Sequence, residues 1–319
     1  MKYKDIINNI RPAGQEARYD SDESVFLERQ LDHIKSQTYD IKYAELKARK
    51  VIPLSSEADP GATRIFYRQY NQSGIAKLVH NYANDLPRAD VIAQEFSTPV
   101  KTIANAYGYN IQELRSAVYG NVPLEQRRAN AARRGIAQTE NSLAFFGDED
   151  ACLQGFFTGQ NVPTTILPAD GAGGSALWAD KEPDQIIRDL NLIANVISEQ
   201  SLGVEIPDTL LLPLDSYNFI SSTPRTSTSD TTILNYFLQN NPYIKEVESI
   251  NELKGAGVNG TRRMAAYRRD PEVLTMEVPM DFEQLEIQPK NLEYTIPCQE
   301  RFGGVLIYYP LAITFADGF

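Results

Sequence analysis

Histidine and cysteine are scarce in this chain, which holds two of each among 319 residues. Cys152 and Cys298 lie far apart and form no CxxC or Cys/His spacing, so neither a disulfide scaffold nor a structural zinc site is predicted. His33 and His80 do not accompany a GxSxG turn or a similar exposed nucleophile. Cys152 paired with one histidine stays open as chemistry, but a half-buried structural thiol is the favoured interpretation. We therefore expect no enzyme, no cofactor and no metal site.

Long hydrophobic runs are also missing. The longest, "VLIYYPLAITF", is interrupted by Pro310 and is too short to cross a membrane. The first twenty residues lack the apolar centre of a signal peptide, so a soluble cytoplasmic protein is expected. The net charge of −11 predicts a surface that repels polyanions, and binding to nucleic acid would need a concentrated basic face.

Two glycine-rich stretches resemble phosphate-binding loops. "GAGVNG" at 255–260 matches GxGxxG. Dinucleotide binding needs a strand just before this motif and a helix that begins at its last glycine, but here a strand is expected after the motif. "GAGGS" at 171–175 lacks the Lys-Ser/Thr ending of a phosphate loop. Both are interpreted as turns or loops.

The pattern of apolar residues predicts an α+β fold. Residues 23–50 are predicted to form an amphipathic helical arm, and "RIFYRQY" followed by the turn signal "NQSG" predicts a hairpin-like extension. An ordinary edge of a domain sheet is the alternative for that extension. "VKTIANAYGYN" predicts a strand, "NIQELRSAV" a short helix, and Pro123 opens a long helix that ends near Phe146, before Gly147.

The second half of the chain mixes helices and strands. Residues 151–180 are predicted to be a loop-rich connector, whose length favours a functional or assembly role. The next segment is the clearest helix, with Asp180 as its expected cap and a stripe of Ile186, Leu190, Ile193 and Ile197. "TLLLPLD" and "YIKEVESI" predict strands around a capped helix at "SDTTILNYFLQNN", and strands dominate from residue 262.

The long helix carries the densest basic cluster, with arginines at 127, 128, 133 and 134. At 100° per residue these arginines spread around the helix, and Arg128 falls on the apolar face, where its head must find a carboxylate or carbonyl. A helix that reads a DNA groove concentrates its arginines on one side. Small residues such as Ala132 and Gly135 instead predict a helix of about 35 Å packed closely on a sheet.

A second charge pattern lies near the C-terminus. Arg262, Arg263, Arg268 and Arg269 precede residues 270–300, which hold eight acids and one lysine. These blocks can pair within the domain or between subunits, and a solvated mixed-charge face is an equal alternative.

The order of these elements resembles tailed-phage major capsid proteins with the Hong Kong 97 fold, which bacterial encapsulins share. The stretches that carry the resemblance run from about residue 20 to the end: "NDLPRADV", "ANAYGYNIQELRSAV", "PLEQRRANAARRGIAQTENSLAFFGD" and "VPMDFEQLEIQPKNLEYTIPCQERFGGVLIYYPLAITFADG". The resemblance implies an N-terminal arm (1–50), an extended loop (51–95), a peripheral domain (96–200) with a spine helix (about 123–146), an axial domain (201–290) and C-terminal strands returning to the core (291–319).

The resemblance also implies a function. The chain is expected to assemble with itself into pentamers and hexamers of an icosahedral shell around double-stranded DNA, contacted non-specifically. Scaffolding, portal and decoration proteins are further expected partners, with assembly in the host bacterial cytoplasm and no membrane. An encapsulin-like compartment shell is the first alternative, and a soluble enzyme without a recognisable motif is the weaker one. The expected subunit-interface residues are Arg64, Arg68, Arg127, Arg133, Arg134, Arg262 and Arg263.

Overall fold

A computed structural model describes residues 43–74, 76, 88–119, 124–226, 228 and 230–319. The chain divides into two units, Met1–Glu45 and Leu46–Phe319, and the second unit is described here. Most of the predicted arm lies outside the described residues. Within 43–50, helix begins only at Ala48, in the four-residue helix α3 (Ala48–Val51), so the prediction of a continuous helix to residue 50 is wrong there. None of the helices in the described part of the chain is long and apolar enough to span a bilayer.

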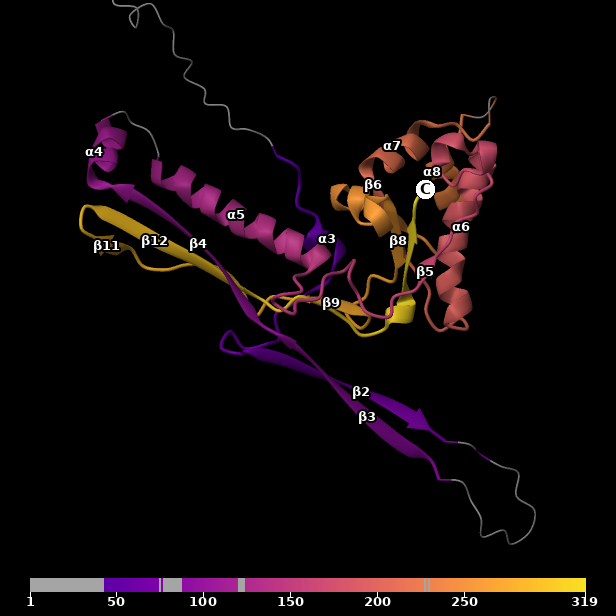
Figure 1. The fold of residues 1–319 in the computed structure, drawn as a ribbon, viewed down its shortest axis with the longest axis horizontal. Helices are drawn as coiled ribbons and strands as arrows, with labels where there is room; N and C mark the ends of the chain where they lie inside the picture. Colours follow the sequence, from indigo (N-terminus) through magenta and orange to yellow (C-terminus); the bar gives the residue numbers. More distant parts are fainter. Residues whose placement is uncertain (1–42, 75, 77–87, 120–123, 227, 229) are drawn as a thin grey trace, which may run out of the picture. The chain divides into compact units, whose positions relative to one another are not determined.

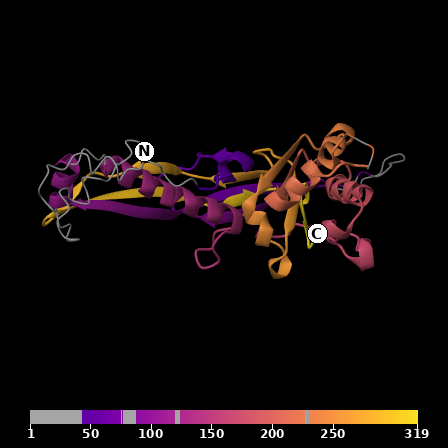
Figure 2. The same cartoon turned by 90° about the horizontal axis from the view of Figure 1, so that it is seen from above.

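A long antiparallel sheet carries the spine helix (Figures 1 and 2). Strand β4 (Lys101–Asn110) pairs with β12 (Glu293–Phe302) along the whole length of both, and β12 also pairs with β10 (Met280–Gln284) and β11 (Gln288–Lys290). In β12 the side chains at 296, 298, 300 and 302 are buried in alternation, as expected when one face of a sheet meets a core. One of these four, Glu300, is a carboxylic acid.

Helix α5 (Leu124–Phe146) packs on β4 and β12, and the short helix α4 (Ile111–Tyr119) precedes it. The predicted close packing is confirmed, because a Cβ on Gly135 would lie 3.0 Å from the side-chain nitrogen Nδ2 of Asn105 in β4. Gly147 ends the helix at φ 68°, as predicted. The helical wheel predicts an apolar face made of Leu124, Ala131, Ala132, Gly135, Ile136, Leu143 and Phe146. This prediction is partly wrong: Ala131 and Phe146 are exposed, and the buried side is lined by Ala132, Ile136, Ala144 and Phe145.

The predicted extension is a two-stranded ribbon formed by β2 (Arg64–Ser73) and β3 (Asp90–Pro99), which pair only with each other (Figure 1). The strands pair over ten residues each, from Arg64 with Pro99 to Ser73 with Asp90. The predicted turn at "NQSG" is wrong, because Asn71, Gln72 and Ser73 continue the strand. Most of the connection between the strands lies outside the described residues.

A second core lies around a five-stranded mixed sheet in the order β5-β14-β8-β6-β7. Helix α6 (Pro183–Gln200) packs on this sheet and on α8, and its predicted stripe at 186, 190, 193 and 197 is buried. Helix α6 thus shares a core with the segment that follows residue 200, where the boundary between the peripheral and axial domains is expected. The N-cap is Glu182 rather than Asp180: its side chain and that of Gln185 form a capping box, with Pro183 at the first helical position.

A third, smaller sheet adds to the core beside α5. A three-stranded sheet has the order β1-β9-β13, and the predicted C-terminal strand is split by a 3-10 turn, so that β13 joins this sheet and β14 the second core. Helix α7 was not predicted, because "LPLDSYNFI" has no helical apolar stripe. The other strands, helices and 3-10 turns (η) of these sheets and their connections are β1 Leu54–Ser55, β5 Thr164–Thr165, η1 Ala172–Gly174, η2 Trp178–Asp180, β6 Thr209–Pro213, α7 Leu214–Ser222, α8 Ile233–Asn240, β7 Glu246–Ile250, η3 Asn251–Gly255, η4 Val258–Gly260, β8 Arg263–Tyr267, β9 Leu274–Glu277, β13 Val305–Ile307, η5 Pro310–Ala312 and β14 Ile313–Asp317.

Candidate functional site

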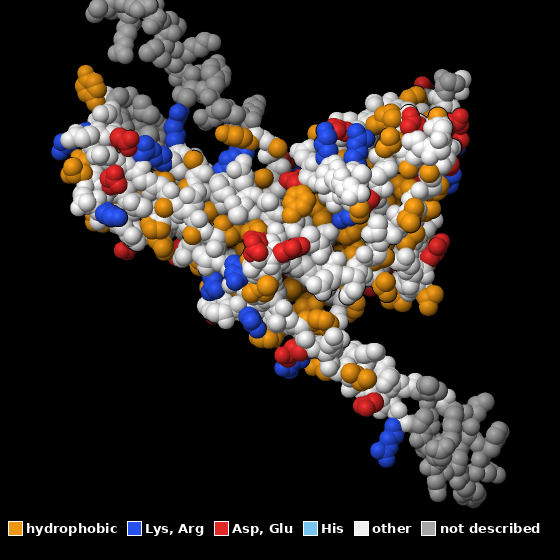
Figure 3. Space-filling model, viewed as in Figure 1, with side chains coloured by type: hydrophobic (Ala, Val, Ile, Leu, Met, Phe, Trp, Pro, Cys, Tyr) orange, Lys and Arg blue, Asp and Glu red, His pale blue; other side chains and the backbone are white. Residues whose placement is uncertain are grey.

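The outer face of the β2–β3 ribbon exposes large apolar side chains. Phe66 is 58% exposed and Tyr70 is 63% exposed, and both point to the same face because alternate residues of a strand do so. Between them Arg68 forms an ion pair with Glu95 across the ribbon at 2.8 Å, and Arg64 is exposed at the start of the strand. In Figure 3 apolar and charged side chains together reach the surface of the ribbon. Such a face is amphipathic and has the composition of a protein contact surface.

The opposite face holds the base of the ribbon on the body. Tyr67 stacks on Phe96 at 5.1 Å and meets the edge of Tyr308 at 5.0 Å between ring centroids. Gln69 donates a 2.5 Å hydrogen bond to the Tyr308 carbonyl, and Thr98 donates one to the Gly303 carbonyl at 3.0 Å. The base of the ribbon is therefore oriented by contacts within the subunit, while its outer face has none of these supports.

A wide groove lies beside the ribbon, with a volume of about 1310 Å³. Several of its apolar lining residues are largely exposed, led by Leu202 at 91% and Val204 at 75%. The other exposed apolar residues of the groove are Tyr70, Ile92, Tyr309 and Leu311. A surface on which several exposed apolar side chains lie together is more often an interaction site than a surface that stays open to solvent.

The arginines of α5 contact different neighbours, as the helical wheel predicts. Arg128 donates to the Gly108 carbonyl and to Glu113 at 3.0 Å, which confirms that its head finds a carbonyl and a carboxylate. Those contacts lower the pKa of the Glu113 carboxyl, through the Arg128 hydrogen bond first. Arg133 lies over the Phe282 ring at 5.5 Å, Arg127 is exposed and Arg134 is half-buried. The helix therefore presents no single basic stripe.

The two adjacent arginines at the start of β8 differ sharply in exposure. Arg262 is 44% exposed at its side chain and lies 4.0 Å from Asp215. Arg263 is buried, with Nε 2.7 Å from Asp317, and Nη1 donates to the Phe157 carbonyl at 3.1 Å. Its guanidinium also covers the Phe315 ring at 4.7 Å. Arg263 is thus used inside the subunit, which argues against its predicted role at an interface.

Within the subunit this arginine block pairs mostly with carboxylates outside residues 270–300, and pairing between subunits stays a prediction. Arg268 contacts Glu205 at 3.1 Å and Asp270 at 2.9 Å, and Arg269 contacts Glu246 at 3.6 Å. Only Asp270 belongs to the acidic block. Glu205 and Glu246 come from segments far from these arginines in the sequence, which sequence proximity does not reveal.

A cluster of three carboxylates surrounds Arg49 of α3. The Arg49 guanidinium lies 2.8 Å from Glu140 of α5, 2.9 Å from Asp281 of β10 and 3.4 Å from Glu300 of β12. Glu140 is 3% exposed and Glu300 1%, whereas the Asp281 side chain is 68% exposed. This group borders a cavity of about 240 Å³. The sequence does not reveal this cluster: a helical wheel places Glu140 near Arg133 of the same helix and gives no sign of Arg49.

The cluster holds three carboxyl groups and one guanidinium, and this imbalance of charge changes the pKa of Glu300 most. Burial, followed by the nearby Glu140 charge, raises the pKa of Glu300 to about 7. Burial opposes the charge of Arg49, but hydrogen bonds to Asp281 and Glu140 raise its pKa above the ordinary value. The Arg49 hydrogen bond lowers the pKa of Asp281. Two buried carboxyl groups therefore share one guanidinium, and one of them takes up a proton near neutral pH.

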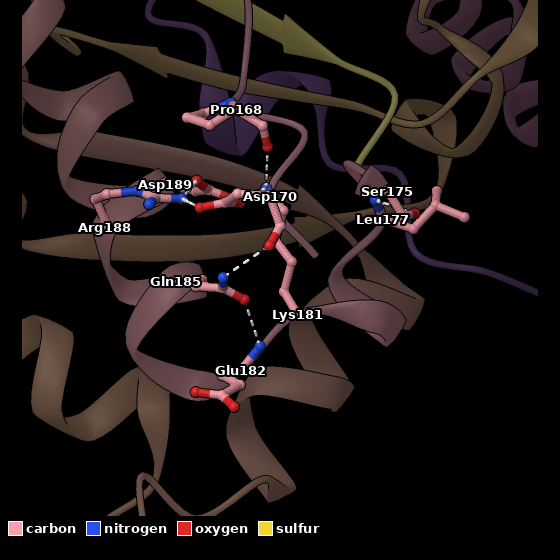
Figure 4. Close-up of polar contacts among 9 residues, drawn as sticks. All are labelled: Pro168, Asp170, Ser175, Leu177, Lys181, Glu182, Gln185, Arg188 and Asp189. Carbon is pink, nitrogen blue, oxygen red and sulfur yellow. Dashed lines mark hydrogen bonds and ion pairs between the residues drawn. The ribbon is translucent and has the colours of Figure 1, made fainter. Parts of the chain in front are cut away.

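The connector at 151–180 is fixed at its end by a buried lysine (Figure 4). Lys181 donates to the Pro168 carbonyl at 2.7 Å and to Asp189 at 2.6 Å, and the side chains of Lys181 and Asp189 are both 0% exposed. Gln185 donates to the Asp170 carbonyl at 2.9 Å and accepts from the Glu182 amide at 2.8 Å. The network attaches the connector to the first turns of α6.

Of the residues considered for nucleophilic chemistry, the two cysteines lie in the described part of the chain. His33 and His80 lie outside the described residues, and Cys298 is buried. Cys152 is exposed, so its interpretation as a half-buried thiol is wrong. Among the described residues no group of three or more His, Cys, Asp or Glu side chains is arranged to hold a metal ion. "GAGVNG" runs from the last residue of the 3-10 turn η3 through the 3-10 turn η4, in agreement with its interpretation as a glycine turn.

Comparisons with known proteins agree with this fold. A family model described as "Major capsid protein" matches residues 74–319. The capsid protein of Myoviridae phage XM1 is 19% identical, with a TM-score of 0.79 over 93% of this chain and 99% of that one. A Mycobacterium phage Ogopogo structure (12% identity, TM-score 0.58, 91% and 97% coverage) and a virus-like particle from Pyrococcus furiosus (15%, 0.54, 84% and 91%) are also similar. No curated protein sequence matches the chain.

Proposed function

The chain belongs to the major capsid protein family, and on this premise we propose that it is the coat subunit of a tailed-phage virion. Subunits assemble into pentamers and hexamers of an icosahedral shell that encloses double-stranded DNA. The observation that carries the proposal is the ribbon, whose base is fixed to its own subunit while Phe66 and Tyr70 face outward at more than half exposure. A neighbouring copy of the chain covers that face.

The proposal gives the parts of the chain separate tasks. The α5 helix and the β4–β12 sheet form the peripheral domain, and the five-stranded sheet with α6, α7 and α8 forms the axial domain. The N-terminal segment and the ribbon reach neighbouring subunits. Arg64, Arg68, Arg127, Arg133, Arg134 and Arg262 are the proposed interface arginines, and Arg263 is left out because its partners are internal.

Other partners follow from a coat role. Scaffolding, portal and decoration proteins contact the shell, assembly takes place in the host bacterial cytoplasm, and packaged DNA is contacted without sequence specificity. The acidic net charge of −11 supports the last point, since a polyanion is held inside by enclosure rather than by a basic surface.

Electron microscopy of the purified chain, together with sedimentation, tests the proposal. Capsomers or closed shells are expected, and only monomers at high concentration and across salt conditions would refute it. The encapsulin-like alternative draws on the likeness to the Pyrococcus furiosus particle. Mass spectrometry separates the two: co-purifying cargo proteins inside shells favour the compartment, and shells that package DNA when the phage proteins are present favour the virion.

A further inference from the structure

The three carboxylates around Arg49 join elements that are far apart in the sequence. Arg49 belongs to α3, Glu140 to α5, Asp281 to β10 and Glu300 to β12. Helix α3 is also the first element of the Leu46–Phe319 unit. Its Ala48 and Val51 side chains are buried, and the Ala48 amide donates to the Asn141 side chain at 3.0 Å. Whatever changes the contacts of Arg49 therefore changes how α3 is held on the spine helix.

We propose that the Glu140–Glu300 pair is a proton-dependent latch that holds α3 on the spine helix and releases its hold as the pH rises above neutrality. The geometry supplies the reason. The Arg49 guanidinium lies 2.8 Å from Glu140 and 3.4 Å from Glu300, and both carboxyl groups are almost fully buried. Two buried carboxylates beside one guanidinium carry excess negative charge, which favours a proton on the pair.

Loss of that proton leaves the cluster with excess negative charge. Arg49 then faces three carboxylates, with Arg133 as the only other charged side chain around the cavity. The Arg133 guanidinium lies over the Phe282 ring, 5.5 Å from its centroid. Two adjacent buried carboxylates repel each other, and the repulsion is relieved when α3 moves and water enters.

The sign follows from the direction of the Glu300 shift. Its pKa is raised from 4.5 to about 7 in the folded protein, so the contribution is present at low pH and is lost as the pH rises through 7. If undocking returns Glu300 to its ordinary value, linkage predicts that the docked-to-undocked ratio of α3 falls about tenfold between pH 6 and pH 8.

Hydrogen exchange of the full-length protein measures this ratio. The Val51 and Ile52 amides donate to the carbonyls of Lys47 and Ala48, so their protection reports on α3. We expect wild-type protection of residues 46–52, corrected for intrinsic exchange at each pH, to fall about tenfold from pH 6 to pH 8. Protection that does not change with pH in the wild type overturns the proposal without any variant.

Three variants assign the effect to the pair. Glu300→Gln and Glu140→Gln each remove one of the two buried carboxyl groups, and either one that folds should show protection that no longer depends on pH. Glu283→Gln is the matched control, because Glu283 lies on the neighbouring strand, is exposed and hydrogen-bonds to Gln299 at 3.0 Å. It should keep the wild-type pH dependence. A tenfold fall that persists in both glutamine variants of the pair contradicts the latch.

Discussion

Replacing Lys181 with methionine should be among the most destabilising single changes in the second core. Lys181 and Asp189 are both 0% exposed at their side chains and lie 2.6 Å apart. The lysine also donates to the Pro168 carbonyl. Methionine is similar in length and fills the same space, so the change mainly removes the charge and the donors. It leaves the Asp189 carboxylate buried without its principal partner.

The magnitude follows from that uncompensated charge. Breaking a buried ion pair by removing one partner typically costs about 3–5 kcal/mol. Arg188 stays 3.3 Å from the other Asp189 oxygen, but its side chain is 46% exposed and also contacts Asp170. Partial compensation by Arg188 places the expectation for Lys181→Met at the lower end, about 3 kcal/mol. Removing both charges in Lys181→Met/Asp189→Leu should recover most of that loss, because no ion is then left buried.

Urea unfolding followed by tryptophan fluorescence measures the loss directly. The chain has one tryptophan, Trp178, which is 3% exposed and stacks on Phe319 in this same core. Lys254→Met is the matched control, since Lys254 pairs with Asp215 at an exposed site and should change stability by less than about 1 kcal/mol. The reasoning is refuted if Lys181→Met costs no more than Lys254→Met, or if the double variant is as unstable as Lys181→Met alone.

Three further predictions concern folding and assembly. Gly147→Ala should prevent correct folding, because φ is 68° and a Cβ would lie 2.4 Å from the Leu153 carbonyl oxygen. Gly173 is the control: its φ is 70°, but a Cβ would meet only open space. Gly173→Ala should therefore lower the free energy of unfolding in urea by only about 1 kcal/mol. Tyr70→Asp should leave Trp178 fluorescence unchanged yet stop shell formation in electron microscopy, and shells at wild-type yield would contradict the ribbon contact. Charge reversal by Arg134→Glu should reduce assembly more than it reduces DNA binding. Sedimentation measures assembly and filter retention measures DNA binding; normal assembly of this variant would contradict the proposed interface role of Arg134.

Local patterns in the sequence predicted the long elements well. The alternation of "VKTIANAYGYN" and the stripe at 186, 190, 193 and 197 each report burial on one face, which is a property of neighbouring residues. The Gly147 stop was predictable for the same reason, because a left-handed residue ends a helix locally. The "NQSG" turn failed because a paired strand on the other side of the ribbon outweighs a weak turn preference.

The charged sites could not be predicted in this way. Glu140 and Arg133 are seven residues apart on one helix, but Glu140 is held by Arg49, which reaches it through the packing of α3. Glu300 follows the apolar alternation of β12 and its burial could be expected from that, yet nothing near it in sequence identifies Glu140 as its neighbour. Pairing between distant segments is a property of the fold, so a chain with 42 acids offers too many equivalent partners.

The basic cluster on α5 shows how the fold changes the meaning of a motif. Arg128 is used to join the helix to β4 and α4, and Arg133 covers an aromatic ring of β10. Arg127 is exposed. Because Arg128 and Arg133 contact different elements, the four arginines cannot act as one electrostatic surface. A helix whose arginines serve different neighbours is suited to holding a subunit together while reaching adjacent copies. It is poorly suited to following the phosphates of a DNA groove, which requires several cations on one side.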